Sequence, residues 1–238
     1  MNGLMALCGI LALLLLAGGV IGLLNPKRFA PRWLLVAALL VTINDALLTR
    51  LYGALPDLLP ASDWNWQGKL LALAATLAIA ALPAFGWRRI GLTLAQHPGS
   101  LKAAMPVALL YCAFFLALAV LLPNDPPSAD EIAFQLTMPG LEEEIFYRGL
   151  LLFALDRAFT ARKRLLGVDW GWGAVLSCLL FGLAHAFGFS HGGFSFDVAT
   201  MALTAIPAFL AVWLRLRTGS LLLPIVLHNF GNAITLLL

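Results

Sequence analysis

Three consecutive acids and one arginine stand at the head of an apolar segment. Glu142, Glu143 and Glu144 precede Arg148 in a chain that is 61% hydrophobic and only 11% charged. Residues four apart share a face of a helix, so Glu144 and Arg148 are expected to pair, with Glu143 about 100° around the helix. Ionisable groups are costly at membrane depth, which makes this cluster a functional-site hypothesis. The alternative is an interfacial charge cluster at a helix start, where acids suit the helix dipole.

Two later apolar segments carry polar side chains at the same spacing. Phe181 and His185 share a face near the end of one segment, and His228 and Asn232 share a face in the last one. A lone buried histidine is more often a packing residue than a catalyst. The second pair favours a site, because lipid would leave both polar side chains without hydrogen-bond partners. We therefore expect a polar cavity or a partner helix beside them.

Eight apolar stretches of spanning or near-spanning length must position these residues. The chain has 238 residues and a mean hydropathy of +0.92, far from the composition of an ordinary globular domain. We predict an all-α fold, a polytopic membrane bundle of about eight transmembrane helices that forms one domain over 1–238. Residues 1–122 hold four helices without motifs, and 135–238 hold the core with motifs. The predicted spans are 4–24, 33–50, 69–86, 103–122, 140–158, 172–188, 196–214 and 219–238.

The basic residues indicate how the bundle sits in the membrane. The net charge of +3 is spread over short connections, so no nucleic-acid partner is expected. Cytoplasmic loops collect Lys and Arg, and twelve of the fifteen follow spans one, three, five and seven. Both termini are therefore predicted to be non-cytoplasmic, in a multi-pass protein of the cell (plasma or inner) membrane. The twelve are Lys27, Arg28, Arg32, Arg88, Arg89, Lys102, Arg157, Arg162, Lys163, Arg164, Arg215 and Arg217. Acids on the other side are Asp57, Asp63, Asp125, Asp130, Glu131 and Asp197.

The polar residues of three spans converge on one level. Span five starts on the side where spans six and eight end, so Glu143, Glu144, His185 and Asn232 fall in one half of the bilayer, with His228 near its middle. A carboxylate beside a neutral imidazole can take a proton from water, while a second histidine and an amide can donate to a developing oxyanion. This constellation suits amide hydrolysis.

Other hydrolytic arrangements are less consistent with the chain. There is no G-x-S-x-G sequence and no suitably placed cysteine, which makes activated water a better candidate than a covalent nucleophile. H-E-x-x-H is absent, so a conventional zincin helix is excluded. Zinc stays an alternative cofactor, because Glu143, His185 and His228 could hold it if their helices pack suitably.

Three motifs in order resemble the CPBP family, which comprises type II CAAX prenyl proteases and the related Abi bacteriocin-processing and immunity proteins. They are Glu143-Glu144-Ile-Phe-Tyr-Arg148, Phe181-Gly-Leu-Ala-His185 and His228-Asn-Phe-Gly-Asn232. The resemblance covers about 135–238 and implies an intramembrane peptidase. It implies that Glu143 and His185 activate water, that His228 and Asn232 stabilise the oxyanion, and that Glu144 and Arg148 support them. Only the frame starting at Glu143 puts Arg148 in register, which leaves Glu142 as a bystander.

The leading interpretation is an intramembrane endopeptidase that acts on a membrane-associated peptide or protein. The alternatives are a non-catalytic immunity or scaffold protein of the same fold and a small proton-coupled transporter. The expected partners are the lipid bilayer and the substrate. The charge count places the site in the outer half of the membrane, which favours a short or membrane-anchored peptide over a prenylated protein.

Two further polar positions stay open. Asn44 and Asp45 form a polar pair inside an expected span, where they either line the cavity or make a contact between helices. His191 lies in a Gly-rich connection and is interpreted as a loop residue, with gating of the site mouth as the alternative.

Overall fold

The computed structural model describes residues 2–51, 56, 59–122 and 126–238. The acids Asp57 and Asp125, predicted on the side opposite most basic residues, lie outside these described residues. The longer helices are α1 (Asn2–Leu24), α2 (Pro31–Ala46), α3 (Trp66–Ala81), α4 (Ser100–Leu121), α7 (Trp172–Ala186), α8 (Val198–Thr218) and α9 (Leu222–Leu237). Shorter or wider helical segments are η1 (Pro26–Arg28), the π-helix η2 (Leu47–Leu51), α5 (Ala129–Gln135), the π-helix η4 (Gly140–Leu151) and α6 (Leu152–Ala158).

Each predicted span contains a helix, but the count of about eight spans is not supported. Among the described residues, four helices are long and apolar enough to cross a membrane, namely α1, α2 with its extension to Thr49, α4 and α8. The helices α3, α7 and α9 have only 15 or 16 residues. At 1.5 Å per residue they are about 24 Å long, short of the roughly 30 Å hydrocarbon core. Pro83 follows α3 directly after its cap, and a hairpin follows α7.

The all-α prediction omitted two small β-hairpins. Strands β1 (Arg162–Leu165) and β2 (Val168–Gly171) pair antiparallel, as do β3 (Phe187–Ser190) and β4 (Gly193–Phe196). The second hairpin turns through His191 and Gly192, whose φ angles of 50° and 79° suit a tight two-residue turn. His191 therefore lies in a loop, as interpreted, and gating of the site mouth stays an untested alternative. Glycine-rich sequence predicted a break at this place but not the strand pairing.

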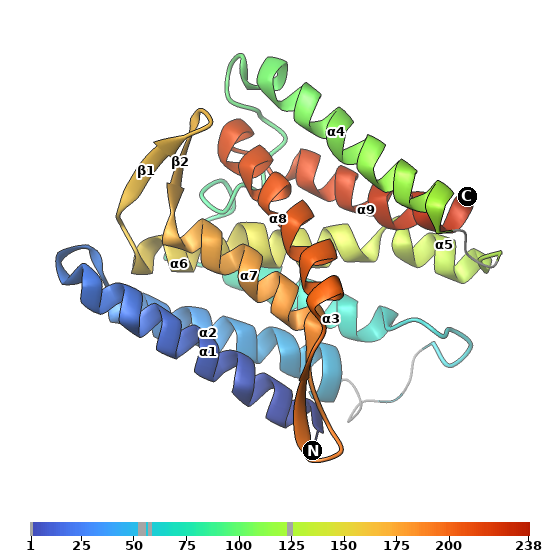
Figure 1. Ribbon diagram of the computed structural model, residues 1–238, viewed down its shortest axis with the longest axis horizontal. Coiled ribbons are helices and arrows are strands. Elements are labelled where there is room, and N and C mark those ends of the chain that lie inside the picture. Colours follow the sequence, from blue (N-terminus) through green and yellow to red (C-terminus); the bar gives the residue numbers. More distant parts are fainter. Residues whose placement is uncertain (1, 52–55, 57–58, 123–125) are drawn as a thin grey trace.

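A continuous helix made of η4 and α6 runs through the middle of the bundle (Figure 1). It contacts α2, α3, α7, α8 and α9, and α4 packs outside α8 and α9. Its side chains are buried around most of its circumference, with Phe146, Leu150, Leu151 and Leu155 at most 2% exposed. Charged groups on the buried faces of this helix must pair within the protein.

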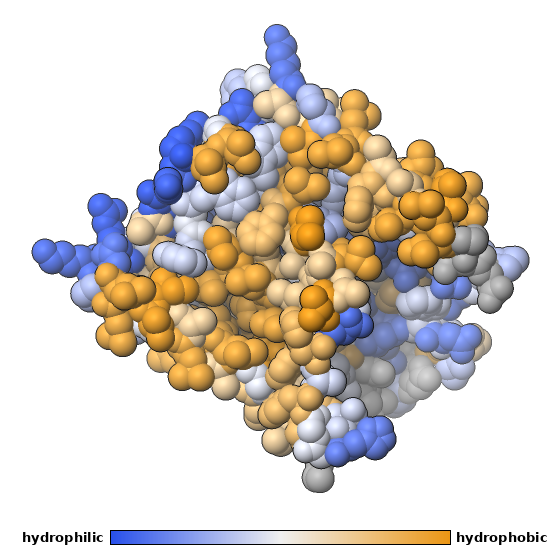
Figure 2. Space-filling view, viewed as in Figure 1, coloured by the Kyte–Doolittle hydropathy of each residue, from blue (hydrophilic) through white to orange (hydrophobic). Residues whose placement is uncertain are grey.

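The four connections that carry most basic residues lie together on one side. The backbone N–H of Thr160 donates to the Arg28 carbonyl (2.9 Å), and that of His97 donates to the Thr218 carbonyl (2.7 Å). The Trp213 indole donates to the Leu166 carbonyl (2.9 Å), which ties the β1–β2 hairpin to α8. Figure 2 shows hydrophilic side chains along the edge where this hairpin lies. The shared side agrees with the charge count, while the orientation of the termini stays a prediction.

At the opposite side, the aspartate before α8 fixes the start of that helix. The Asp197 carboxylate accepts hydrogen bonds from the backbone N–H groups of Ala199 (2.9 Å) and Thr200 (3.1 Å). These bonds, led by that from the Thr200 backbone, lower the pKa of Asp197 from its ordinary value. The cap sets where α8 begins, and α8 forms one wall of the cavity described next.

Candidate functional site

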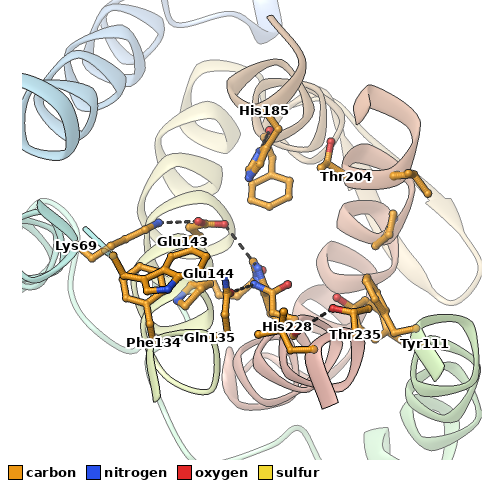
Figure 3. A pocket seen from close by; sticks show the side chains of 18 of the residues that line it. Lys69, Tyr111, Phe134, Gln135, Glu143, Glu144, His185, Thr204, His228 and Thr235 are labelled. Atoms are coloured by element: carbon orange, nitrogen blue, oxygen red, sulfur yellow. Dashed lines mark hydrogen bonds and ion pairs between the residues drawn. The ribbon is translucent and has the colours of Figure 1, made fainter. Parts of the chain in front are cut away.

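One cavity of about 590 Å³ collects the residues singled out by their spacing. It lies among helices α3, α4, α5, η4, α7, α8 and α9 (Figure 3). All six predicted site residues line it: Glu143, Glu144, Arg148, His185, His228 and Asn232. The sequence predicted that the polar residues of three spans lie at a similar depth, and their common place in one cavity agrees with this prediction. Their chemical roles stay predictions.

The start of η4 lies unusually close to α9. The Gly140 backbone N–H donates to the Asn229 side-chain oxygen at 2.7 Å. A Cβ at Gly140 would lie 2.6 Å from the Ile225 carbonyl oxygen, so only glycine permits this approach. The close packing brings His228, on the next turn of α9, within reach of the acids on η4. A π-helix is also rare and is frequently found at functional sites.

The predicted Glu144–Arg148 pair forms, and a histidine joins it. Arg148 Nη1 lies 3.1 Å from Glu144 Oε1, and both side chains are at most 2% exposed. The same carboxylate oxygen accepts a hydrogen bond from His228 Nδ1 at 2.7 Å. The Arg148 guanidinium also stacks 4.0 Å from the centre of the Phe181 ring. Glu144 and Arg148 therefore hold the His228 ring in one orientation.

Glu143 is more open to the cavity than Glu144. Its side chain is 14% exposed, compared with 1% for Glu144. Glu143 Oε1 accepts from Lys69 Nζ at 2.6 Å, and its Oε2 lies 3.6 Å from His228 Nε2. Figure 3 shows Glu143 between these two partners. The longer separation is beyond hydrogen-bond range, so an oxygen of water or substrate could contact Glu143 and His228 together.

Glu142 is not the bystander that its sequence position predicted. It is completely buried, and its Oε2 lies 2.7 Å from the same Lys69 ammonium that holds Glu143. Its other oxygen accepts from the Asn44 amide at 2.6 Å. For Asn44, the contact between helices is thus the correct alternative, although it and Asp45 also line a separate cavity of about 220 Å³. Lys69 is a functional candidate that the sequence analysis missed, and the available signal was a lone lysine inside an apolar segment.

His185 stands across the cavity from the acids (Figure 3). Its Nδ1 lies 2.8 Å from the Phe181 carbonyl oxygen, which can only accept, so Nδ1 carries the hydrogen of this bond. In the neutral ring, Nε2 then keeps a lone pair that can take a proton. Within the described residues, His228 contacts Glu143, whereas no ion pair joins Glu143 to His185. Shared water activation by Glu143 and His185 therefore needs a water molecule between them.

Asn232 lies one turn beyond His228 on the same face of α9. Its amide donates to the Gln135 side-chain oxygen at 3.0 Å, which links α9 to α5. Both residues line the cavity. Gln135 thus orients the Asn232 amide at the cavity, and the spacing of the motif did not predict this partner.

The zinc alternative stays a prediction. Over the described ranges, no three histidine, cysteine, aspartate or glutamate side chains form a group that could hold a metal ion. The set Glu143, His185 and His228 is therefore spread too widely for a closed zinc site in this arrangement. One oxygen of Glu143 is also already paired with Lys69. Metal analysis of the purified protein tests this alternative.

Comparisons with known proteins bear on the second half of the chain. The family model for the type II CAAX prenyl endopeptidase Rce1-like family matches residues 126–234. No curated protein and no solved structure matches the chain. The matched segment contains η4, α7, α8 and nearly all of α9, and it holds all six predicted site residues. Lys69 and Asn44 lie outside it.

Proposed function

Because residues 126–234 match the family model of the type II CAAX prenyl endopeptidase Rce1-like family, we propose that this protein is an intramembrane endopeptidase. It hydrolyses a peptide bond in a membrane-associated peptide or protein with water activated by glutamate and histidine. The observation that carries the proposal is the lining of one cavity by Glu143, His185, His228 and Asn232, together with the more deeply buried pair Glu144 and Arg148.

Glu143 is the proposed base. Its Oε2 lies 3.6 Å from His228 Nε2, and the Glu143 side chain is partly exposed. The carboxylate takes a proton from water while the water oxygen bonds to the substrate carbonyl carbon. The same proton then passes to the amide nitrogen as the carbon–nitrogen bond breaks. His185, with Nε2 available, orients this water from the opposite side of the cavity.

His228 and Asn232 are the proposed donors to the oxyanion, with His228 donating through Nε2–H of the doubly protonated ring, because its Nδ1–H already donates to Glu144. They lie four residues apart on one face of α9, and each is held by a second residue, Glu144 and Gln135 respectively. Donors that are already oriented cost no reorganisation when negative charge develops on the carbonyl oxygen. The ion pair of Glu144 with Arg148 fixes His228 in this role.

The rest of the cavity wall indicates the substrate class. Trp64, Phe115, Phe134, Leu203 and Leu236 supply apolar surface around the polar residues. An extended peptide with apolar side chains matches such a wall, and burial of those side chains from water favours its binding. A short or membrane-anchored peptide is therefore the proposed substrate.

Comparative proteomics of membrane and secreted peptides tests the proposal. Cells with wild-type protein are compared with cells that produce Glu143→Gln, which keeps the shape but removes the base. Glu131→Gln is the matched control, because Glu131 on α5 does not line the cavity. We expect specific peptides to disappear only in Glu143→Gln cells. An unchanged peptide set and full biological activity at normal protein levels would favour the immunity or scaffold alternative.

A further inference from the structure

A second polar cavity of about 410 Å³ lies on the basic side of the bundle, apart from the proposed active site. Three segments form it: the loop before α4, the β1–β2 hairpin and the end of α8. Its polar lining includes His97, Ser100, Arg164, Asp169 and Arg217. None of these residues lines the catalytic cavity.

The walls of this basic cavity are fixed by hydrogen bonds between the three segments. Arg217 Nη1 donates to the Gly167 carbonyl at 3.2 Å, which ties α8 to the hairpin turn. His97 Nδ1 lies 3.3 Å from the Arg217 carbonyl oxygen, which ties the loop to α8. Gly167 has a φ of 78°, a conformation that suits glycine, and a Cβ there would lie 3.3 Å from Arg217 Nη1. The cavity is therefore built by specific contacts rather than by loose surface loops.

Two buried polar atoms at this cavity lack hydrogen-bond partners within the described part of the chain. One is Nε of Arg217, and the other is Oγ of Ser100, whose side chain belongs to a residue only 3% exposed. Buried polar groups are almost always paired, so each unpaired one calls for a ligand or water. Over the same residues, no carboxylate lies within ion-pair distance of Arg217. Asp169 is already paired with Arg164 at 3.1 Å.

The start of α4 adds a third feature that favours a bound anion. Ser100 is the first residue of this 22-residue helix, and the preceding cap, Gly99, provides no side-chain hydrogen bond. The Ser100 N–H already donates to the His97 carbonyl at 3.1 Å, but the next N–H groups and the positive end of the helix dipole attract anions. An unpaired guanidinium nitrogen, a buried hydroxyl and a helix start without a side-chain cap thus border one cavity. Phosphate oxygens are suitable acceptors for all three.

The surroundings favour a lipid as the source of the phosphate. The cavity lies where two membrane-spanning helices, α4 and α8, begin and end respectively. Leu101, Met105 and Leu109 are 44–64% exposed and follow one face of α4 from this point. Most basic residues of the chain are on this side, which the charge count predicts to be cytoplasmic, and that leaflet is rich in anionic lipids. We propose that the basic cavity binds the headgroup phosphate of an anionic phospholipid whose acyl chain lies along α4.

Lipid retention measured by native mass spectrometry tests this proposal. The full-length protein is released from nanodiscs that contain phosphatidylcholine with one fifth phosphatidylglycerol. Wild type is expected to retain phosphatidylglycerol preferentially. Arg217→Gln is expected to reduce this preference about tenfold, the effect of losing one hydrogen bond between a guanidinium and a phosphate. Arg88→Gln is the matched control, since Arg88 is exposed on the same side and does not line the cavity.

Several outcomes would overturn the proposal. Equal losses in Arg217→Gln and Arg88→Gln would mean that only general surface charge attracts the lipid. An unchanged preference for phosphatidylglycerol in Arg217→Gln would show that this cavity does not bind the lipid. If Arg217→Gln fails to fold, Ser100→Ala keeps the size of the residue and must lower the same preference. Thermal stabilisation by inorganic phosphate in pure phosphatidylcholine nanodiscs, equal to that by phosphatidylglycerol, would assign the site to free phosphate instead.

Discussion

Removal of the Lys69 ammonium should destabilise the protein by an amount that its two ion pairs allow us to estimate. Lys69 Nζ lies 2.7 Å from Glu142 and 2.6 Å from Glu143, and Glu142 is fully buried. Loss of one partner of a buried ion pair costs about 3–5 kcal/mol, because the other charge stays buried without its partner. Asn44 continues to donate to Glu142, so we expect the lower value for Lys69→Met, about 3 kcal/mol. That corresponds to a fall of about 6–12 °C in the melting temperature of a chain of this size.

Thermal unfolding of the purified protein in detergent measures this effect, and a double variant identifies its cause. Lys69→Met with Glu142→Gln removes the cation together with one buried acid, so we expect it to recover at least half of the lost stability. Two results would refute the reasoning. One is a melting temperature of Lys69→Met within about 2 °C of wild type. The other is a double variant in which the two single losses simply add.

Three other changes test the site. His185→Asn keeps a donor for the carbonyl that Nδ1 contacts but lacks Nε2, so peptidase turnover should fall about 100-fold with little change in melting temperature; wild-type turnover would contradict this. Asn232→Ala should lower kcat about 100-fold with KM nearly constant, as for a lost oxyanion donor, whereas steady-state kinetics that show a rise in KM alone would contradict that role. Gly140→Ala should lower both melting temperature and peptide hydrolysis, because its Cβ meets the Ile225 carbonyl at 2.6 Å. Gly19→Ala meets nothing within 4 Å and should lower neither, so equal behaviour of the two would contradict the packing argument.

The contacts within one helix were predictable from spacing. The interval of four residues correctly paired Glu144 with Arg148, which lie 3.1 Å apart, and it placed His185 beside Phe181. Hydrophobic runs also located every long helix. These relations depend only on the periodicity of a helix, which determines from the sequence alone which residues share a face.

Contacts between distant helices were beyond the sequence. Glu142 was interpreted as a bystander because no local rule says that Lys69 and Asn44, 73 and 98 residues away, face it from α3 and α2. The π-helical form of η4 has no clear signal in its residues either. The count of about eight spans is not supported, because apolar composition does not reveal where a short helix ends in a turn or a hairpin.

Peptide hydrolysis by Glu143→Gln tests the central claim most directly. A peptide whose cleavage depends on the wild-type protein is incubated with wild type, Glu143→Gln and the control Glu131→Gln, each reconstituted in liposomes at equal amounts of folded protein. Removal of a general base costs about 10²–10⁴ in rate, so Glu143→Gln should hydrolyse the peptide at least 100-fold more slowly, with Glu131→Gln unchanged. Hydrolysis by Glu143→Gln at the wild-type rate would contradict the assignment of Glu143 as the base that activates water.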